Sequence, residues 1–182
     1  RIMLFLRREG YLFNVGIEPE HFLVTKAPNG SIAEWDPKRT DQLRNPCYDF
    51  KATASAIGYL RDIMDAMDRL GWDPYQCDHE DANGQFEINF GYADALTTAD
   101  RYTFFKIMTR KYAQRYGAIA TYMAKPFEDR PGNGGHIHYH LANATTGQNL
   151  FVDEEDSRRL GLSEIAYNFI GGIFAHAPAL CA

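Results

Sequence analysis

Residues 80–87 combine a tight-turn signal with a glutamate at each end. The central Asn83-Gly84 dipeptide is the strongest short-range signal for a two-residue β-hairpin, because both residues accept positive φ angles. A turn centred there predicts that Glu80 lies directly opposite Glu87, with their Cβ atoms about 4.5–5.5 Å apart on one face. Two like charges at that separation destabilise a sheet unless a positive charge lies between them. The pattern therefore predicts a divalent cation at this hairpin.

A second acidic pair, Glu18 and Glu20, occupies alternate positions of a half-apolar segment that is typical of a β-strand. Alternate residues of a strand share a face, so both carboxylates and Phe22 are expected on the same side of the sheet. Charged side chains are rarely buried unless they are paired. The two interpretations are a ligand pair and a solvated strand face, and this segment alone does not choose between them.

Three histidines alternate in the sequence His136-Ile137-His138-Tyr139-His140, which also favours a strand. A His-x-His-x-His pattern by itself is compatible with a three-histidine zinc site. A site with several carboxylates, one imidazole and no thiol fits hard ions such as Mg²⁺ or Mn²⁺ better. The candidate ligands on the expected strands are Glu18, Glu20, Glu80, Glu87 and His136.

The composition limits the class of protein. The chain has 182 residues, of which 45% are hydrophobic and 24% charged, as expected for one soluble domain with a substantial core. A net charge of -5 gives no basic surface for nucleic acid, and no apolar run approaches the roughly 20 residues of a membrane span. Cys47, Cys77 and Cys181 are odd in number and contain no C-x-x-C pair, which favours a reducing cytoplasm.

Helical and strand-like segments follow one another without a regular βαβ alternation, which predicts an α+β fold with a mainly antiparallel sheet and packed helices. The expected elements are a helix ending at Gly10, a strand or two successive strands over 11–25, an irregular segment over 31–49, a helix over 53–70, a hairpin over 75–92, a helix from Thr97 to near Gly117, strands over 118–123 and 136–141, and a helix beginning at Ser163. In the helix over 53–70, helical spacing predicts one apolar stripe packed in the core, formed by Ile57, Leu60, Met64 and Met67.

Three separated motifs resemble the catalytic domain of the glutamine synthetase family over nearly the whole chain. They are G-I-E-P-E at residues 16–20, E-x-A-x-G-Q-x-E at residues 80–87, and K-P at 125–126 followed by G-N-G-G-H-I-H at 132–138. The amino-acid sequence of residues 47–49 and 78–89 also resembles the branch of the family that includes γ-glutamylmethylamide synthetases. One departure is Pro131, which stands where the family has an asparagine, while Asn133 lies two residues further on.

The resemblance implies two sites for Mg²⁺ or Mn²⁺. Glu20, Glu80 and Glu87 match the ligands of one ion, and Glu18 and His136 match ligands of the other. It further implies nucleotide-binding roles for His138 and Tyr92, and substrate-binding roles for Glu20 and Gly132. No further catalytic residue is identified.

The implied activity is an ATP-dependent ligase that joins ammonia or a small amine to the γ-carboxyl of L-glutamate through γ-glutamyl phosphate. The family's N-terminal domain and its C-terminal arginine-bearing part have no counterpart here, so residues 1–182 are expected to be a partial catalytic domain that is inactive in isolation. The resemblance also implies that the full-length parent forms a homo-oligomeric ring. The alternative is a non-catalytic fragment or remnant that binds only metal or nucleotide.

Overall fold

The computed structural model of the protein describes residues 1–36, 38 and 43–180. Cys181 and part of the segment expected to be irregular therefore lie outside the described residues. The chain divides into two compact units. Unit 1 comprises residues 1–15, 94–96 and 138–182, and unit 2 comprises residues 16–93 and 97–137. All five candidate metal ligands belong to unit 2.

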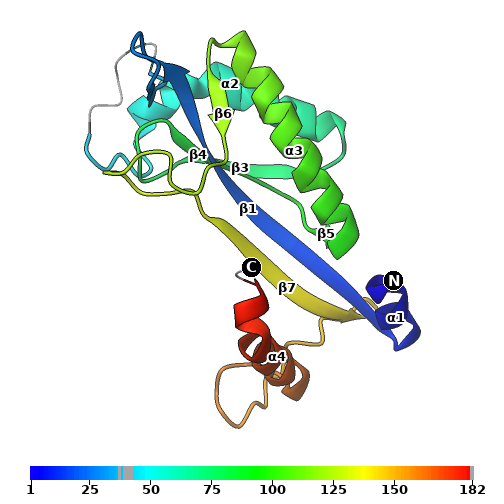
Figure 1. Ribbon diagram of the computed structural model, residues 1–182. Coiled ribbons are helices and arrows are strands. Elements are labelled where there is room, and N and C mark those ends of the chain that lie inside the picture. Colours follow the sequence, from blue (N-terminus) through cyan, green and yellow to red (C-terminus); the bar gives the residue numbers. More distant parts are fainter. Residues whose placement is uncertain (37, 39–42, 181–182) are drawn as a thin grey trace. The chain divides into compact units, whose positions relative to one another are not determined.

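The described residues form helices and strands that alternate irregularly along the chain (Figure 1). In order, they are α1 (Ile2–Arg8), β1 (Tyr11–Lys26), β2 (Ile32–Glu34), α2 (Phe50–Arg69), β3 (Pro74–His79), β4 (Gln85–Phe90), β5 (Ala93–Asp94), α3 (Ala95–Arg115), β6 (Ile119–Thr121), β7 (Gly135–Asn143) and α4 (Glu164–Leu180).

The strands form one sheet organised around β1. The hydrogen-bonded order is β2-β1-β4-β3, and β5, β6 and β7 also pair with β1. β1 runs antiparallel to β2, β4 and β6, and β3 runs antiparallel to β4. The expected α+β class with a mainly antiparallel sheet is confirmed. Long β1 carries two of the candidate ligands, Glu18 and Glu20.

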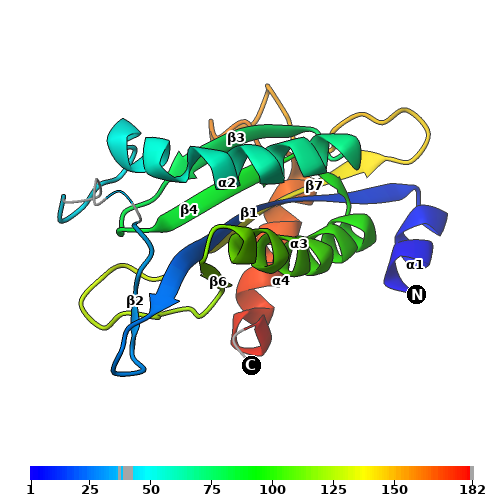
Figure 2. The same ribbon diagram turned by 90° about the horizontal axis from the view of Figure 1, so that it is seen from above.

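The two faces of the sheet in unit 2 have different chemistry. Leu23, Phe86 and Ile88 belong to the hydrophobic core that also contains side chains of α2 and α3. Figure 2 shows both helices on the same side of β1, β3 and β4. Side chains alternate between the two faces of a strand, so the residues next to these core positions point away from the helices. They are Glu20 and Phe22 on β1, and Gln85, Glu87 and Asn89 on β4. Glu20 and Glu87 therefore lie on the face that the helices leave open.

Helix α2 begins where its sequence supplies a cap. The side chain of Asp49 accepts hydrogen bonds from the amides of Lys51 and Ala52, which satisfies two donors of the first turn. The buried positions of the helix include Leu60 and Met67 from the expected apolar stripe. Ile57, which the same stripe included, is 55% exposed, and the buried face instead uses residues such as Tyr59 and Ile63.

The expected hairpin register is wrong by two residues. Asp78, and not Glu80, pairs with Glu87, and the amide of Glu80 donates to the carbonyl of Gln85 at 2.9 Å. Only Gly84 in the turn has a positive φ, of 71°, and the amide of Gln85 donates to the carbonyl of Ala82 at 3.0 Å. The turn is therefore not type I′, which needs positive φ at both central residues. A shift of two residues keeps every side chain on its expected face.

Contacts with β1 explain the longer turn. The carbonyl of Gly84 accepts from the amide of Leu23 at 2.8 Å, so the end of the hairpin is tied to β1. A Cβ at Gly84 would lie 3.0 Å from the Leu23 carbonyl oxygen. Glycine at this position therefore serves both the positive φ and the close approach of two backbones.

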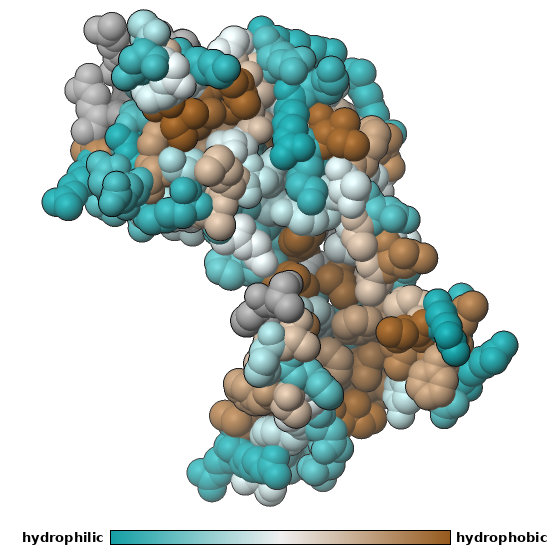
Figure 3. All heavy atoms as spheres, viewed as in Figure 1, coloured by the Kyte–Doolittle hydropathy of each residue, from teal (hydrophilic) through white to brown (hydrophobic). Residues whose placement is uncertain are grey.

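Unit 1 is held together by aromatic side chains. Phe13, Tyr139 and Phe169 have ring centroids 5.8–5.9 Å apart in pairs, and Phe151 lies 5.2 Å from Phe169. α1 precedes this cluster and ends before Gly10, whose φ is 87°, as the sequence predicts. Figure 3 shows apolar side chains at the surface over α1, in agreement with an exposed fraction above 60% for its residues Ile2, Leu4 and Phe5.

Among the described residues, none of the helices has the length and apolar character that crossing a membrane requires.

Candidate metal centre

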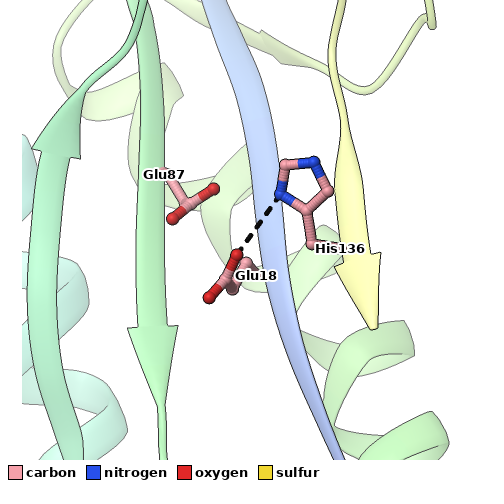
Figure 4. A group of neighbouring side chains, drawn as sticks. All are labelled: Glu18, Glu87 and His136. Atoms are coloured by element: carbon pink, nitrogen blue, oxygen red, sulfur yellow. Dashed lines mark ion pairs between the residues drawn. The ribbon is translucent and has the colours of Figure 1, made fainter. Parts of the chain in front are cut away.

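Three side chains from three strands converge on the open face of the sheet in unit 2. Glu18 comes from β1, Glu87 from β4 and His136 from the first residues of β7 (Figure 4). One potential ligand atom of each residue lies within 4.8 Å of the others. Oε2 of Glu18 is 3.3 Å from Nδ1 of His136. Two carboxylates and one imidazole are thus arranged as a ligand group for a cation.

Glu20 lies beside this group because it is the direct partner of Glu87 across β1 and β4. It is 8% exposed, and its Oε2 accepts hydrogen bonds from Gln85 Nε2 and from the amide of Gly134, each at 2.8 Å. A buried carboxylate held by two donors has a fixed orientation. Glu20 is therefore positioned by protein groups before any ligand binds.

Glu80 directly follows the end of β3, and its carboxyl group is near enough to Glu20 and Glu87 to interact with their charges. We call Glu18, Glu20, Glu80 and Glu87 the acidic cluster. Burial raises the pKa of Glu80 to about 7, and the charges of Glu87, Glu20, Asp78 and Asp81 add to this effect. Such a shift means that the folded chain opposes ionisation of this carboxyl group. A divalent cation is the kind of ligand that would reverse this preference.

Glu87 belongs to the group with Glu18 and His136, and it is also the direct strand partner of Glu20. Burial raises its pKa, a hydrogen bond from Asn89 opposes the rise, and the charges of Glu18, Glu20 and Asp78 reinforce it. Asn89 Nδ2 donates to Glu87 Oε1 at 2.8 Å. The sequence resemblance assigns Glu87 to one ion and Glu18 with His136 to another, whereas the geometry brings these three residues within reach of one another.

The donor set fits a hard divalent ion. Carboxylate oxygens predominate, one imidazole nitrogen is present, and burial with like-charge repulsion raises the pKa of two of the carboxyl groups. Mg²⁺ and Mn²⁺ prefer oxygen ligands, and their positive charge would offset this repulsion. The cluster is therefore chemically suited to these ions.

The remaining predicted site residues are not members of the acidic cluster, although Gly132 shares a hydrogen-bonding partner, Gln85, with Glu20. Gly132 belongs to the segment before β7, and its carbonyl accepts from Gln85 Nε2 at 3.0 Å. Tyr92 is 65% exposed and lies two residues after the end of β4. His138 is an exposed residue of β7 and belongs to unit 1, unlike the five candidate ligands.

Two site residues escaped the sequence interpretation. Gln85 and Asn89 are buried amides on the same face of β4 as Glu87, and each donates to a carboxylate of the cluster. The signal was present in the alternation of Gln85, Glu87 and Asn89 between the apolar residues of β4. Polar residues at every second position of a fully buried strand are costly unless they have partners. Such a pattern predicts a polar network on one face.

The family model described as the glutamine synthetase catalytic domain matches residues 1–182. The chain belongs to the glutamine synthetase family. The resemblance carried by the three motifs is thus confirmed over the whole sequence.

Two relatives illustrate the range of names within this glutamine synthetase family. The glutamate–methylamine ligase of Methyloversatilis universalis is 44% identical over 173 residues, which are 95% of this chain and 38% of the relative. The glutamine synthetase of Rhizobium leguminosarum bv. phaseoli is 42% identical over 182 residues, which are 100% of this chain and 40% of the relative. The chain therefore spans about 40% of the length of these relatives.

Solved structures give the same result for the fold. A structure described as the GmaS–ADP complex in conformation 1 matches with a TM-score of 0.87 and 44% identity, covering 97% of this chain and 39% of that one. The glutamine synthetase of Plasmodium falciparum matches with a TM-score of 0.84 at 22% identity, covering 98% and 39% of the two chains. The second likeness establishes the fold alone.

Proposed function

We propose that this chain is the metal-binding core of an ATP-dependent ligase that joins ammonia or a small amine to the γ-carboxyl of L-glutamate. The observation that carries the proposal is the convergence of Glu18, Glu87 and His136 on the open face of the sheet. The membership of the glutamine synthetase family supports the reaction class. The reaction proceeds through γ-glutamyl phosphate, from which the amine displaces phosphate.

Mg²⁺ or Mn²⁺ is the proposed cofactor. Glu20, Glu80 and Glu87 would hold one ion, and Glu18 and His136 another, with Glu87 in reach of both sets. Bound divalent ions would stabilise the negative charge that gathers when ATP and glutamate meet. The protein's own contribution is to hold the carboxylates in place through Gln85, Asn89 and the Gly134 amide.

Substrate-binding roles complete the proposal. Gly132 and Glu20 would contact the substrate glutamate, and His138 and Tyr92 would contact the nucleotide. The link between Gly132 and Glu20 through Gln85 supports a common role for the first pair. The exposed fraction of 65% leaves the ring of Tyr92 accessible to a ligand.

The acceptor amine is proposed as either ammonia or methylamine. The relative named for methylamine is 44% identical and the glutamine synthetase of Rhizobium leguminosarum is 42% identical, so identity does not separate the two acceptors. We further propose that residues 1–182 form part of a larger catalytic domain, that the full-length parent is a ring-forming cytoplasmic enzyme, and that the isolated chain is inactive.

The alternative function is binding of metal or nucleotide without catalysis. A ligand cluster needs only the converging side chains, whereas phosphoryl transfer also needs positive groups aimed at the transferred phosphate, and removal of such a group can cost about 10³-fold or more in rate. The relatives are more than twice as long as the chain, which leaves room for those groups in the intact protein.

The deciding experiment measures phosphate release by the intact protein with ATP, glutamate, and either ammonia or methylamine. We expect release that requires ATP, glutamate, one of the amines and Mg²⁺ or Mn²⁺ together. Release that is independent of glutamate would contradict the ligase. Metal binding without any phosphate release would favour the non-catalytic alternative.

A further inference from the structure

The buried side chain of Gln85 joins three parts of unit 2. Its exposed fraction is 1%. Nε2 donates to Glu20 Oε2 at 2.8 Å, to the carbonyl of Gly132 at 3.0 Å and, more weakly, to Asn133 Oδ1 at 3.3 Å. Oε1 accepts from the amide of Ala82 at 3.2 Å. A single amide thus connects the hairpin turn, the acidic cluster and the segment that precedes β7.

The segment of residues 132–134 is held against the same carboxylate from its other side. The amide of Gly134 donates to Glu20 Oε2 at 2.8 Å. The amide of Asn133 donates to the carbonyl of Ala124 at 2.9 Å, and its side chain donates to the carbonyl of Met123 at 2.9 Å. Residues 132–134 therefore lie between Glu20 with Gln85 and the chain that follows β6.

The space around this contact is filled. A Cβ at Gly134 would lie 2.6 Å from Glu20 Oε1, and a Cβ at Gly132 would lie 2.3 Å from the carbonyl oxygen of Ala124. Neither glycine has a positive φ, so the close approach and not the backbone angle requires them. Packing this tight transmits a shift of Glu20 to residues 132–134 and the reverse.

We infer that Gln85 is a positioning residue that couples the orientation of Glu20 to the order of residues 132–134. Both donors bind Oε2 of Glu20, and this restrains the orientation of the whole carboxylate. A cation that binds this carboxylate fixes it further, and through Gln85 and the Gly134 amide it stabilises the segment that includes Gly132. The inference rests on the proposed function for the identity of its ligand, a divalent cation.

Asn89 provides a matched comparison on the same strand. Like Gln85 it is a buried amide of β4, and its Nδ2 donates to a carboxylate of the cluster, Glu87, at 2.8 Å. Its donor bond ends on Glu87 and not on residues 132–134. Loss of either amide should weaken cation binding, but only loss of Gln85 should loosen that segment.

The experiment combines Mn²⁺ titration with hydrogen exchange of peptides that cover residues 132–134 in the intact protein. In the wild type, Mn²⁺ should slow exchange in this segment. In Gln85→Met, Mn²⁺ affinity should fall by about 10- to 100-fold, as for other groups that orient metal ligands, and exchange should be about tenfold faster without Mn²⁺ because a hydrogen bond is lost. In this variant, saturating Mn²⁺ should no longer slow the exchange of residues 132–134 to the rate of the Mn²⁺-bound wild type. Asn89→Leu should lose affinity and keep the wild-type exchange of residues 132–134.

Circular dichroism establishes that each variant is folded. If Gln85→Met fails to fold, Gln85→Leu replaces it, because it also removes the donor to Glu20 and adds no charge or ligand oxygen beside that carboxylate. Wild-type affinity and exchange in a folded Gln85 variant would overturn the coupling alone. A wild type that binds no Mn²⁺ would contradict the proposed cofactor as well as the coupling. Equal loosening of residues 132–134 in Asn89→Leu would reduce Gln85 to a general packing role.

Discussion

Glu20 on β1 and Glu87 on β4 are direct partners in adjacent antiparallel strands although both side chains are acidic. Each carboxylate is held by an amide of β4, Glu20 by Gln85 and Glu87 by Asn89, at 2.8 Å in both cases. Like charges in such a pair are destabilising without a compensating group. The sheet therefore retains an arrangement that costs stability, as expected where a strained set of groups serves a ligand.

The raised pKa of Glu80 predicts that the stability of the metal-free protein falls as the pH rises from 4.5 to about 7. The pKa of Glu80 is about 7 in the folded chain, against an ordinary value of 4.5, so the folded state binds more protons than the unfolded state between these values. The free energy of unfolding must then decrease with rising pH in this window. In Glu80→Gln this decrease should be shallower, as measured by denaturant unfolding in the presence of a chelator.

Mn²⁺ should reverse this trend, because the ion binds the ionised carboxylates. Affinity in the wild type should rise between about pH 6 and about pH 8 more steeply than in Glu80→Gln, because the proton of Glu80 must leave before the ion binds. Identical pH profiles for wild type and variant would remove Glu80 from the cluster.

Two neighbouring glycines predict different outcomes for the same substitution. In Gly134→Ala the new Cβ would lie 2.6 Å from Glu20 Oε1, whereas at Gly135 nothing lies within 4 Å of the added atom. Glu20 cannot turn away without losing its two hydrogen bonds. Gly134→Ala should weaken Mn²⁺ binding by about tenfold or more, in line with the loss of a group that orients a ligand.

Gly135→Ala serves as the control for that substitution. Its Mn²⁺ affinity should stay within about a factor of three of the wild type, because no contact is disturbed. Calorimetric titration of both variants compares them directly. Equal affinities in the two alanine variants would mean that the packing of Gly134 against Glu20 does not matter for the site.

The face that the helices cover contains a buried histidine, His21. It is fully buried, its Nε2 lies 2.8 Å from the hydroxyl oxygen of Tyr59, and burial lowers its pKa from 6.5 to about 3. The folded state thus binds fewer protons than the unfolded state between these values. Stability must be lost as the pH falls from 6.5 towards 3.

His21→Leu should flatten this acid dependence and should lower stability near neutral pH by about 1–3 kcal/mol, because the hydroxyl of Tyr59 loses its partner in the core. The double variant His21→Leu with Tyr59→Phe should recover part of that loss, since it removes the orphaned hydroxyl as well. Unfolding curves at several pH values measure both effects. An unchanged slope below neutral pH in His21→Leu would show that this histidine is not responsible.

The sequence predicts the fold class and the faces of the strands because alternation of side chains depends only on local order. Glu18, Glu20, Glu87 and His136 lie where the motifs and the period of two put them, on the face away from the helices. The sequence also predicts that α2 packs an apolar stripe against the sheet. The exposed side chain of Ile57 shows that the buried face of the helix is rotated relative to this predicted stripe.

The hairpin register was not predictable from Asn83-Gly84 alone. The local signal favours a two-residue turn, but the hydrogen bond from Leu23 to Gly84 ties the turn to a strand about 60 residues earlier in the chain. The side chain of Asn83 also donates to the carbonyl of Leu43 at 3.0 Å, a use that the turn interpretation does not include. Long-range contacts therefore decide the register that local preference leaves free.

Divalent ions should also stabilise the whole fold by mass action. Binding to the folded state alone adds about 2.7 kcal/mol when the free ion is at 100 times its dissociation constant. Mn²⁺ should therefore raise the melting temperature of the wild type more than that of Glu18→Gln, which loses one member of the ligand group. A melting temperature that does not respond to Mn²⁺ in the wild type would contradict a preformed cation site.

The central claim, that the clustered carboxylates bind a divalent cation, is tested most directly by Mn²⁺ titration of Glu87→Gln and Asp81→Asn in the intact protein. Both substitutions remove one negative charge from the same hairpin, but only Glu87 belongs to the converging group, whereas Asp81 lies exposed in the turn. We predict that Glu87→Gln lowers the affinity for Mn²⁺ by about 10-fold or more and that Asp81→Asn changes it by less than about threefold. Equal losses in the two variants would contradict a defined ligand site and would leave only a diffuse acidic surface.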